Sequence, residues 1–182
     1  MKPLSAIRRY FEDADSDAQA RNTIAAVVLS NMPFYPLYAA WIVGAAAWPT
    51  LLSFLAMPLF AIVPALNRRG GTAGQWGLVA AGLLDTGLCA AGLGAGTGVE
   101  AFYGPIALLP TVLYRNAPAG RRVAMAAAVV AVFGLGWFID RPPMFTPDDL
   151  RSLTILHLIS AGTLCVLILI LRWKIHKSPS SA

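Results

Sequence analysis

Four residues that could bind a ligand or move a proton lie within or beside long apolar runs: Asp85, Glu100, Tyr103 and His157. Carboxyl, phenol and imidazole groups form directional hydrogen bonds, and carboxyl and imidazole groups also serve in acid–base chemistry. In an apolar setting such groups are costly, so each requires a partner or a function. The four residues are therefore our candidates for one polar ligand-binding pocket.

Asp85 is the most costly of the four, because it falls in the middle of the apolar run 74–94. A central aspartate costs roughly 2.5–3.5 kcal/mol in a membrane-spanning helix, so it should face other helices rather than lipid. Small residues recur every four positions around it, at Gly77, Ala81 and Cys89, and would admit a close neighbour. Two interpretations stay open: a buried neutral acid that hydrogen-bonds to a neighbour, or a ligand contact or proton-sensitive switch.

The other candidates gather in what we expect to be the outer half of the same bundle. His157 lies about two turns into the last apolar run and shares a face with Thr154 and Ser160, so it should point inward. Glu100 and Tyr103 begin an earlier run from the same side. This arrangement predicts an outward-facing pocket with the central aspartate near its floor. The alternative is that the glutamate and the tyrosine only anchor the end of a span at the membrane interface.

The sequence shows no set of ligands for a metal ion or a haem group and no catalytic motif. His157 is the only histidine in an apolar run, since His176 lies in the C-terminal tail. Haem held by two histidines needs both on facing helices, and a zinc site needs several nitrogen, sulfur or oxygen ligands together. The Gly-rich turn at 92–98 follows no strand, so it does not indicate a phosphate-binding loop. We expect no cofactor, no metal and no catalytic activity.

The amino-acid composition indicates whether the chain lies in water or in a lipid bilayer. Of 182 residues, 57% are apolar and only 13% are charged, with a mean hydropathy of +0.64. Soluble domains carry about 25% charged residues, so this chain belongs in a lipid bilayer and leaves no room for a soluble catalytic domain. The net charge of +5 does not indicate a nucleic-acid partner, because the basic residues sit between the apolar runs. Cys89 and Cys165 fall inside such runs and read as packing residues.

The apolar runs predict an all-α membrane protein with six transmembrane helices arranged as three hairpins. A polar, partly amphipathic segment, 1–22, would lie along the membrane surface before the bundle of 23–173, and a short tail, 174–182, would follow. Pro33 and Pro36 predict a kink or local unwinding near Tyr35. The predicted spans are about 23–46, 49–66, 74–94, 99–114, 123–139 and 152–171.

Orientation follows from the lysine and arginine residues between these spans. Twelve of the fourteen lie in the N-terminal segment, the second and fourth connections and the tail, and two lie in the fifth connection. Cytoplasmic loops carry the excess of basic residues in membrane proteins. Both termini are therefore expected in the cytoplasm, and the alternation along the chain supports an even number of spans.

The hairpin GLGAGTGVEAFYGPIALLPTVLYR carries a resemblance to a known class of domain. Its short Gly turn, its aromatic start at Phe102 and Tyr103 and its apolar run to Leu109 and Pro110 resemble the six-helix membrane domains of bacterial class III adenylate cyclases, sensor histidine kinases and diguanylate cyclases. The similar layout covers about residues 20–175. The resemblance implies an inner-membrane receptor or regulator, in which some relatives detect small diffusible ligands and the last helix leads to an output domain. Here the sequence ends nine residues after Trp173, so the chain would be an isolated receptor module, or its output would lie on a separate cyclase or kinase. The haem-binding histidines of some relatives are absent.

Two functional hypotheses follow. The first is a non-catalytic, homodimeric signal-transduction module of the bacterial inner membrane, in which a ligand shifts the last helix and residues 172–177 transmit the shift. The second is a small transporter that uses Asp85, although no internal repeat relates the two halves of the chain. A membrane-embedded enzyme or assembly factor ranks below both, because no nucleophile, base and metal are grouped.

Overall fold

The computed structural model describes residues 3–138 and 144–177, which form helices and their connections and no strand. The all-α prediction is confirmed over these residues. The predicted end of the fifth span at residue 139 and the end of the tail, 178–182, lie outside them. In chain order the elements are α1 (Pro3–Phe11), α2 (Ser16–Asn31), α3 (Tyr35–Val43), η1 (Gly44–Leu55), α4 (Met57–Arg69), α5 (Gly71–Leu93), η2 (Val99–Phe102), α6 (Tyr103–Leu108), η3 (Leu109–Leu113), α7 (Ala119–Leu135), η4 (Gly136–Phe138) and α8 (Pro147–Lys177).

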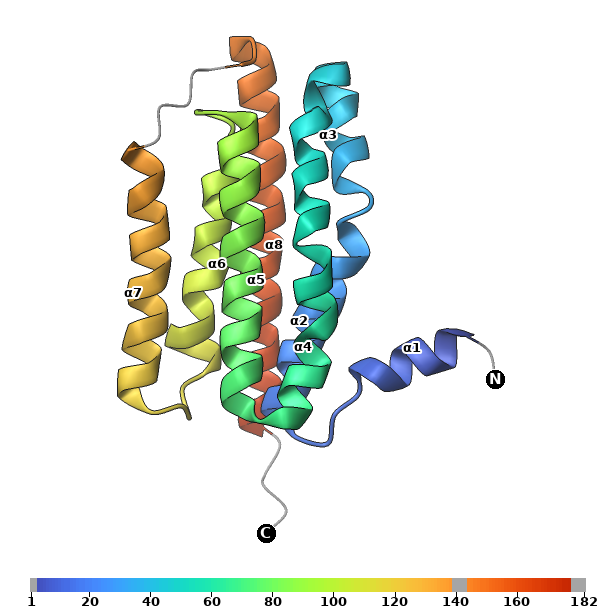
Figure 1. Cartoon of the computed structure of the whole chain (residues 1–182), viewed down its shortest axis with the longest axis vertical. Helices are drawn as coiled ribbons and strands as arrows, with labels where there is room; N and C mark the ends of the chain where they lie inside the picture. The colour runs from blue at the N-terminus through green and yellow to red at the C-terminus, as the bar shows by residue number, and fades with distance from the viewer. Residues whose placement is uncertain (1–2, 139–143, 178–182) are drawn as a thin grey trace.

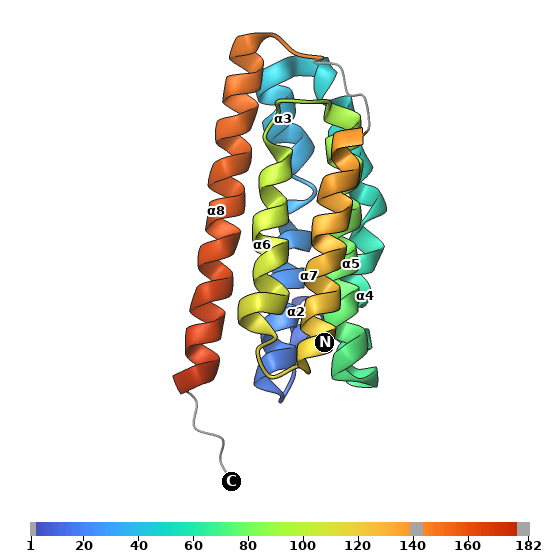
Figure 2. The same cartoon turned by 90° about the vertical axis from the view of Figure 1, so that its left-hand side faces the viewer.

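α1 extends sideways near one end, and the other helices run lengthwise through one bundle in which the chain reverses direction at each end (Figure 1). α2 and α3 lead from one end to the other, η1 and α4 return, and α5 leads back again. The stretch η2–α6–η3, then α7, and finally α8 continue this alternation (Figure 2). We call the end at Gly70, between α4 and α5, the lower end, and the end at which α8 begins at Pro147 the upper end.

Residues 32–34 interrupt the first pass, as the prolines predicted. α2 ends at Asn31, and α3 begins at Tyr35 with Pro36 in its first turn. Pro33 has no N–H, so the backbone carbonyl of Leu29 loses the donor that would continue the helix. The break therefore sets the position of Tyr35 at the start of a new helix.

α2 begins at Ser16, earlier than the predicted first span. The side chain of Asp15 caps the helix by accepting a hydrogen bond from the backbone N–H of Asp17 at 2.8 Å. The first turns of α2 then lie inside the bundle, where Arg21 and Asn22 are buried although they are polar. Part of the segment assigned from sequence to the surface is thus packed into the lower end.

Hydrogen bonds between side chains connect α2 to α4 at this lower end. Nε of Arg21 donates to Oδ1 of Asn67 at 2.6 Å, and Nδ2 of Asn67 donates to Oδ1 of Asn22 at 2.6 Å. Gly74 of α5 lies against the same asparagine, since a Cβ there would be 1.6 Å from Oδ1 of Asn67. We call Arg21, Asn22, Asn67 and Gly74 the polar clasp. It joins α2, α4 and α5 at the level where the bundle meets the basic lower end.

Three helical segments among the described residues are long and apolar enough to cross a membrane, judged by length and composition. These are Tyr35–Arg69, Gly71–Leu93 and Pro147–Lys177, and Val99–Leu113 is apolar but shorter. The first segment reverses direction after Gly44, whose φ is +60°, so α3 and α4 run antiparallel (Figure 1). These segments identify a multi-pass membrane protein.

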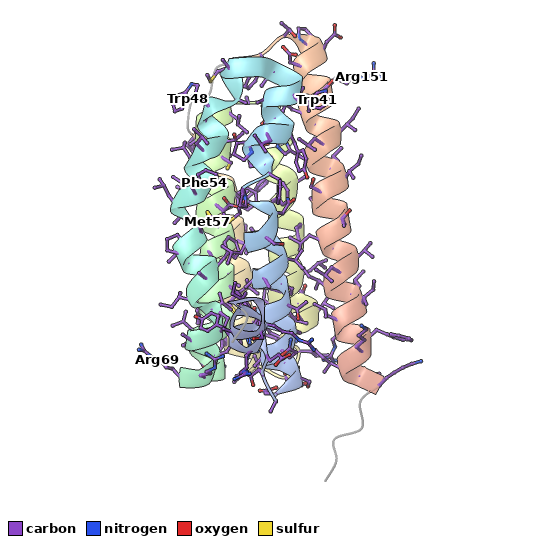
Figure 3. All side chains as sticks on the ribbon, turned by 90° about the vertical axis from the view of Figure 1, so that its right-hand side faces the viewer. Trp41, Trp48, Phe54, Met57, Arg69 and Arg151 are labelled. Atoms are coloured by element: carbon purple, nitrogen blue, oxygen red, sulfur yellow. The ribbon has the colours of Figure 1, made fainter. Side chains whose placement is uncertain are left out.

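Basic side chains gather at the lower end, whereas exposed tryptophans lie at both ends. Trp41, Trp48 and Arg151 lie toward the upper end, and Arg69 lies at the lower end (Figure 3). Trp173, near the lower end of α8, is exposed like Trp41 and Trp48. α4 and α8 both end in basic residues there, and α7 begins with Arg121 and Arg122 in its first turn. Tryptophan at both ends and an excess of basic residues at one of them fit the two faces of a bilayer.

Candidate functional site

A cavity of about 650 Å³ lies beside the break between α2 and α3. Its walls come from α2, α3, α5, η2 and α8, with one residue of η1. Most lining side chains are apolar, and a few polar groups converge among them, which is typical of small-molecule binding sites. The polar residues of the lining include Tyr35, Ser53, Asp85, Cys89, His157 and Ser160.

His157 is the best-connected polar residue of this cavity, and only 1% of its surface is exposed. Its Nδ1 lies 2.7 Å from the backbone oxygen of Thr97. A carbonyl oxygen only accepts hydrogen bonds, so Nδ1 carries the proton. In the neutral ring Nε2 is then the acceptor, and the hydroxyl of Tyr35 donates to it at 2.9 Å. This tyrosine–histidine–carbonyl chain joins α3, α8 and the α5–η2 connection.

The α5–η2 connection can approach α8 because it is rich in glycine. Gly96 and Gly98 have φ values of +83° and +76°, a region that side-chain-bearing residues rarely adopt. A Cβ at Gly98 would lie 3.0 Å from the Cα of Thr154. The hydroxyl of Thr154 also donates to the backbone oxygen of Gly96 at 3.0 Å. Two hydrogen bonds thus connect this turn to α8, one from Thr154 and one from the histidine a turn later.

On the α5 wall of the cavity Asp85 has a buried carboxyl oxygen. Its Oδ1 is inaccessible to solvent and has no hydrogen-bond partner among the described residues. The hydroxyl of Ser53, which is 1% exposed and also lines the cavity, has none either. Cys89 is buried one turn along the same helix. Buried polar atoms are rarely left without a partner, so a hydrogen bond to either oxygen would be stabilising.

The mouth of the cavity faces the side of the bundle. Its exposed lining residues belong to α2 and α3 on one edge and to α8 on the other, among them Val27, Phe34, Tyr38 and Ile159. These helices are neighbours on that side (Figure 3). The sequence predicted an opening toward the outer face, whereas the structure opens the cavity between helices at the level of the proline break.

The structure brings two of the four predicted residues to this cavity, Asp85 and His157. Glu100 and Tyr103 are not part of its lining. Tyr103 is 8% exposed and packs edge-on against Phe133 of α7, with ring centroids 5.4 Å apart. Glu100 lies in η2, close enough to exert a Coulombic effect on the histidine. It is a neighbour of the site rather than part of its wall.

Sequence reasoning missed three residues that shape the site: Tyr35, Ser53 and Phe102. The ring of Phe102 lies 6.2 Å from that of His157 at 70°. The signal for the tyrosine was present, because a proline break at membrane depth is tolerated where it is buried in protein or lines a cavity. No comparable signal marks the serine, which comes from the 3₁₀ stretch η1. Among the described residues no group of three His, Cys, Asp or Glu side chains could hold a metal ion.

Comparison with known proteins gives no match: no family model, no curated protein and no solved structure is significantly similar to this chain.

Proposed function

We propose that this chain is a receptor-like module of the bacterial inner membrane that crosses the bilayer six times and binds a small, largely apolar ligand in the lateral cavity. The six crossings would be α2–α3, η1–α4, α5, η2–α6–η3, α7 and α8. Basic residues at the lower end support a cytoplasmic location for that end, and hence for both termini. The homodimer and the separate cyclase or kinase partner stay predictions.

One observation carries this proposal: the hydrogen-bonded chain from Tyr35 through His157 to the backbone of Thr97 lines a cavity and also holds α8 in place. A ligand group that bonds to the tyrosine hydroxyl competes with the histidine for it. Ligand binding is then coupled to the position of α8. A ligand acts through this link only if it has different affinities for two positions of the helix.

α8 is suited to carry such a displacement to the lower end. It is one continuous helix of 31 residues, about 46 Å long at 1.5 Å per residue. The histidine lies in its upper half, and the basic residues of its last turn, Lys174 and Lys177, lie at the opposite end. A shift of the upper half therefore moves the end that a cytoplasmic partner would contact.

A reporter fusion tests the proposal. A cyclase domain joined after Lys174 should change its basal output when His157→Ala removes the link to Thr97, because α8 loses a fixed contact. Leu158→Ala is the matched control, since its side chain is exposed on the next position of the same helix. The receptor function is rejected if His157→Ala and Tyr35→Phe both give the output of the control and of the unmodified chain.

A small transporter is the second candidate, favoured by the unpartnered Oδ1 of Asp85 beside a broken helix. Ionisable residues inside membrane bundles often lie on substrate or proton pathways. Proteoliposome flux of protons or of a labelled solute that Asp85→Asn abolishes would favour transport. Absence of such flux, with an intact response in the fusion, would favour the receptor.

A further inference from the structure

The cavity has an acidic group with no basic counterpart in its wall. Asp85 is the only carboxyl residue among the described lining residues, which include no lysine or arginine. Among the described residues, its Oδ1 has no hydrogen-bond partner. A buried carboxylate without a counter-charge is strongly unfavourable. A proton on the carboxyl group or a cation bound beside it removes this cost.

His157 does not serve as the counter-charge. Its two ring nitrogens already meet Thr97 and Tyr35, so neither is free to turn toward the carboxyl group. The remaining titratable residues of the lining are tyrosines and Cys89, which supply no positive charge. The electrostatics of the cavity thus favour a positive group.

Aromatic rings surround the same space. Phe34, Tyr35, Tyr38 and Phe102 all line the cavity, two of them at its exposed mouth. The face of an aromatic ring attracts an ammonium group, and the attraction grows when the group is removed from water. Much of the remaining wall is aliphatic and suits a hydrocarbon body, although Asn31, Thr86 and Thr163 also line it. Acid, rings and aliphatic wall together describe one kind of ligand.

We propose that the cavity binds a lipophilic ammonium compound, a single protonated or quaternary amine on an apolar body, with Asp85 as its counter-ion. The ligand enters sideways from the bilayer between α3 and α8, and its amine group lies against the carboxyl group of Asp85. This deepens the proposed function, since it rests on the same cavity, and it identifies the chemical class of the ligand.

Binding to the full chain in nanodiscs of uncharged lipid tests this inference, with binding to empty discs subtracted. The probes are octylammonium, octyltrimethylammonium, octanol and octanoate, which share one alkyl body and differ in the charge and hydrogen bonding of the head. We expect both ammonium probes to bind at least about tenfold more tightly than octanol, a difference of about 1.4 kcal/mol. Octanoate should bind most weakly, because it brings a second negative charge.

Variants separate charge from folding. Asp85→Asn should reduce the preference for ammonium over octanol to less than about threefold, whereas Asp85→Glu should retain it. Glu100→Gln is the matched control, an acid nearby that does not line the cavity, and it should leave the preference unchanged. Loss of octanol binding in Asp85→Asn would point to misfolding, in which case the retained preference of Asp85→Glu carries the test.

Three outcomes would overturn the inference: octanol binding as tightly as the ammonium probes, no binding of any probe, or an unchanged preference in Asp85→Asn. A cavity that binds octanol best and depends on Tyr35 would take neutral amphiphiles, and the receptor function would stand without the cationic ligand. A negative result of the reporter fusion with His157→Ala would count against the receptor function and not against the ligand class, because that experiment uses no probe.

Discussion

The hydroxyl of Tyr35 lies 2.9 Å from Nε2 of His157, although 122 positions separate the two residues in the chain. One belongs to the first turn of α3, just after the proline break, and the other to the buried face of α8. This contact joins the start of the bundle to its last helix within the wall of the cavity. It is the feature whose removal should be most informative.

Tyr35→Phe should destabilise the protein while leaving the packing of the ring intact. The change leaves Nε2 of His157 buried without a donor, which costs about 1–3 kcal/mol. Thermal unfolding in detergent should show this as a Tm lower by several degrees. Tyr38→Phe is the control, because Tyr38 is exposed at the mouth, and it should leave Tm unchanged. Equal Tm values for the two variants would show that the contact adds nothing to stability.

Gly98→Ala should loosen the turn that holds α8. A φ of +76° costs a side-chain-bearing residue about 1–2 kcal/mol, and the new Cβ would also press on the Cα of Thr154 at 3.0 Å. Faster hydrogen exchange in the first half of α8 would report the change. Gly104→Ala, with nothing within 4 Å of its added Cβ, should leave exchange there as it is. The importance of the tight approach is refuted if both variants behave alike.

Gly74→Ala should disrupt the polar clasp at the lower end. Its Cβ would overlap Oδ1 of Asn67, so the asparagine must move away from Arg21 and leave a buried guanidinium poorly paired. We expect a loss of about 1–3 kcal/mol, measured by unfolding in detergent. Gly87 lies on the same helix with nothing within 4 Å, and Gly87→Ala should be neutral or stabilising by up to about 1 kcal/mol. The reverse order would contradict this account.

Cysteine labelling from one side of the membrane should separate the two ends of the bundle. Met144→Cys, in the exposed segment before α8 at the upper end, should react with an impermeant maleimide in intact cells with a permeable outer membrane. Arg69→Cys, at the lower end, should react only after the inner membrane is opened. The unmodified chain controls for Cys89 and Cys165. Labelling of both positions from the same side would refute the proposed topology.

Local chemistry and composition were enough to predict the lipid environment, the all-α fold and the helix break before Tyr35. Apolar runs and the scarcity of charge determine that the chain enters lipid, and Pro33 lacks an N–H in every environment. The inward direction of Asp85 and His157 also followed from the sequence, because a polar group on a regular helix avoids lipid wherever a protein face is available.

Tertiary structure decided which of the candidates share a cavity and where it opens. Tyr103 was assigned to the pocket because it begins a span from the same side as His157, but its ring packs against Phe133 of α7. Depth along the bundle does not decide which neighbouring helix a side chain meets. The lateral mouth and the contact between Tyr35 and His157 depend on how distant helices pack. No local property of the sequence determines that packing, because it is the balance of many contacts made only when the whole bundle is assembled.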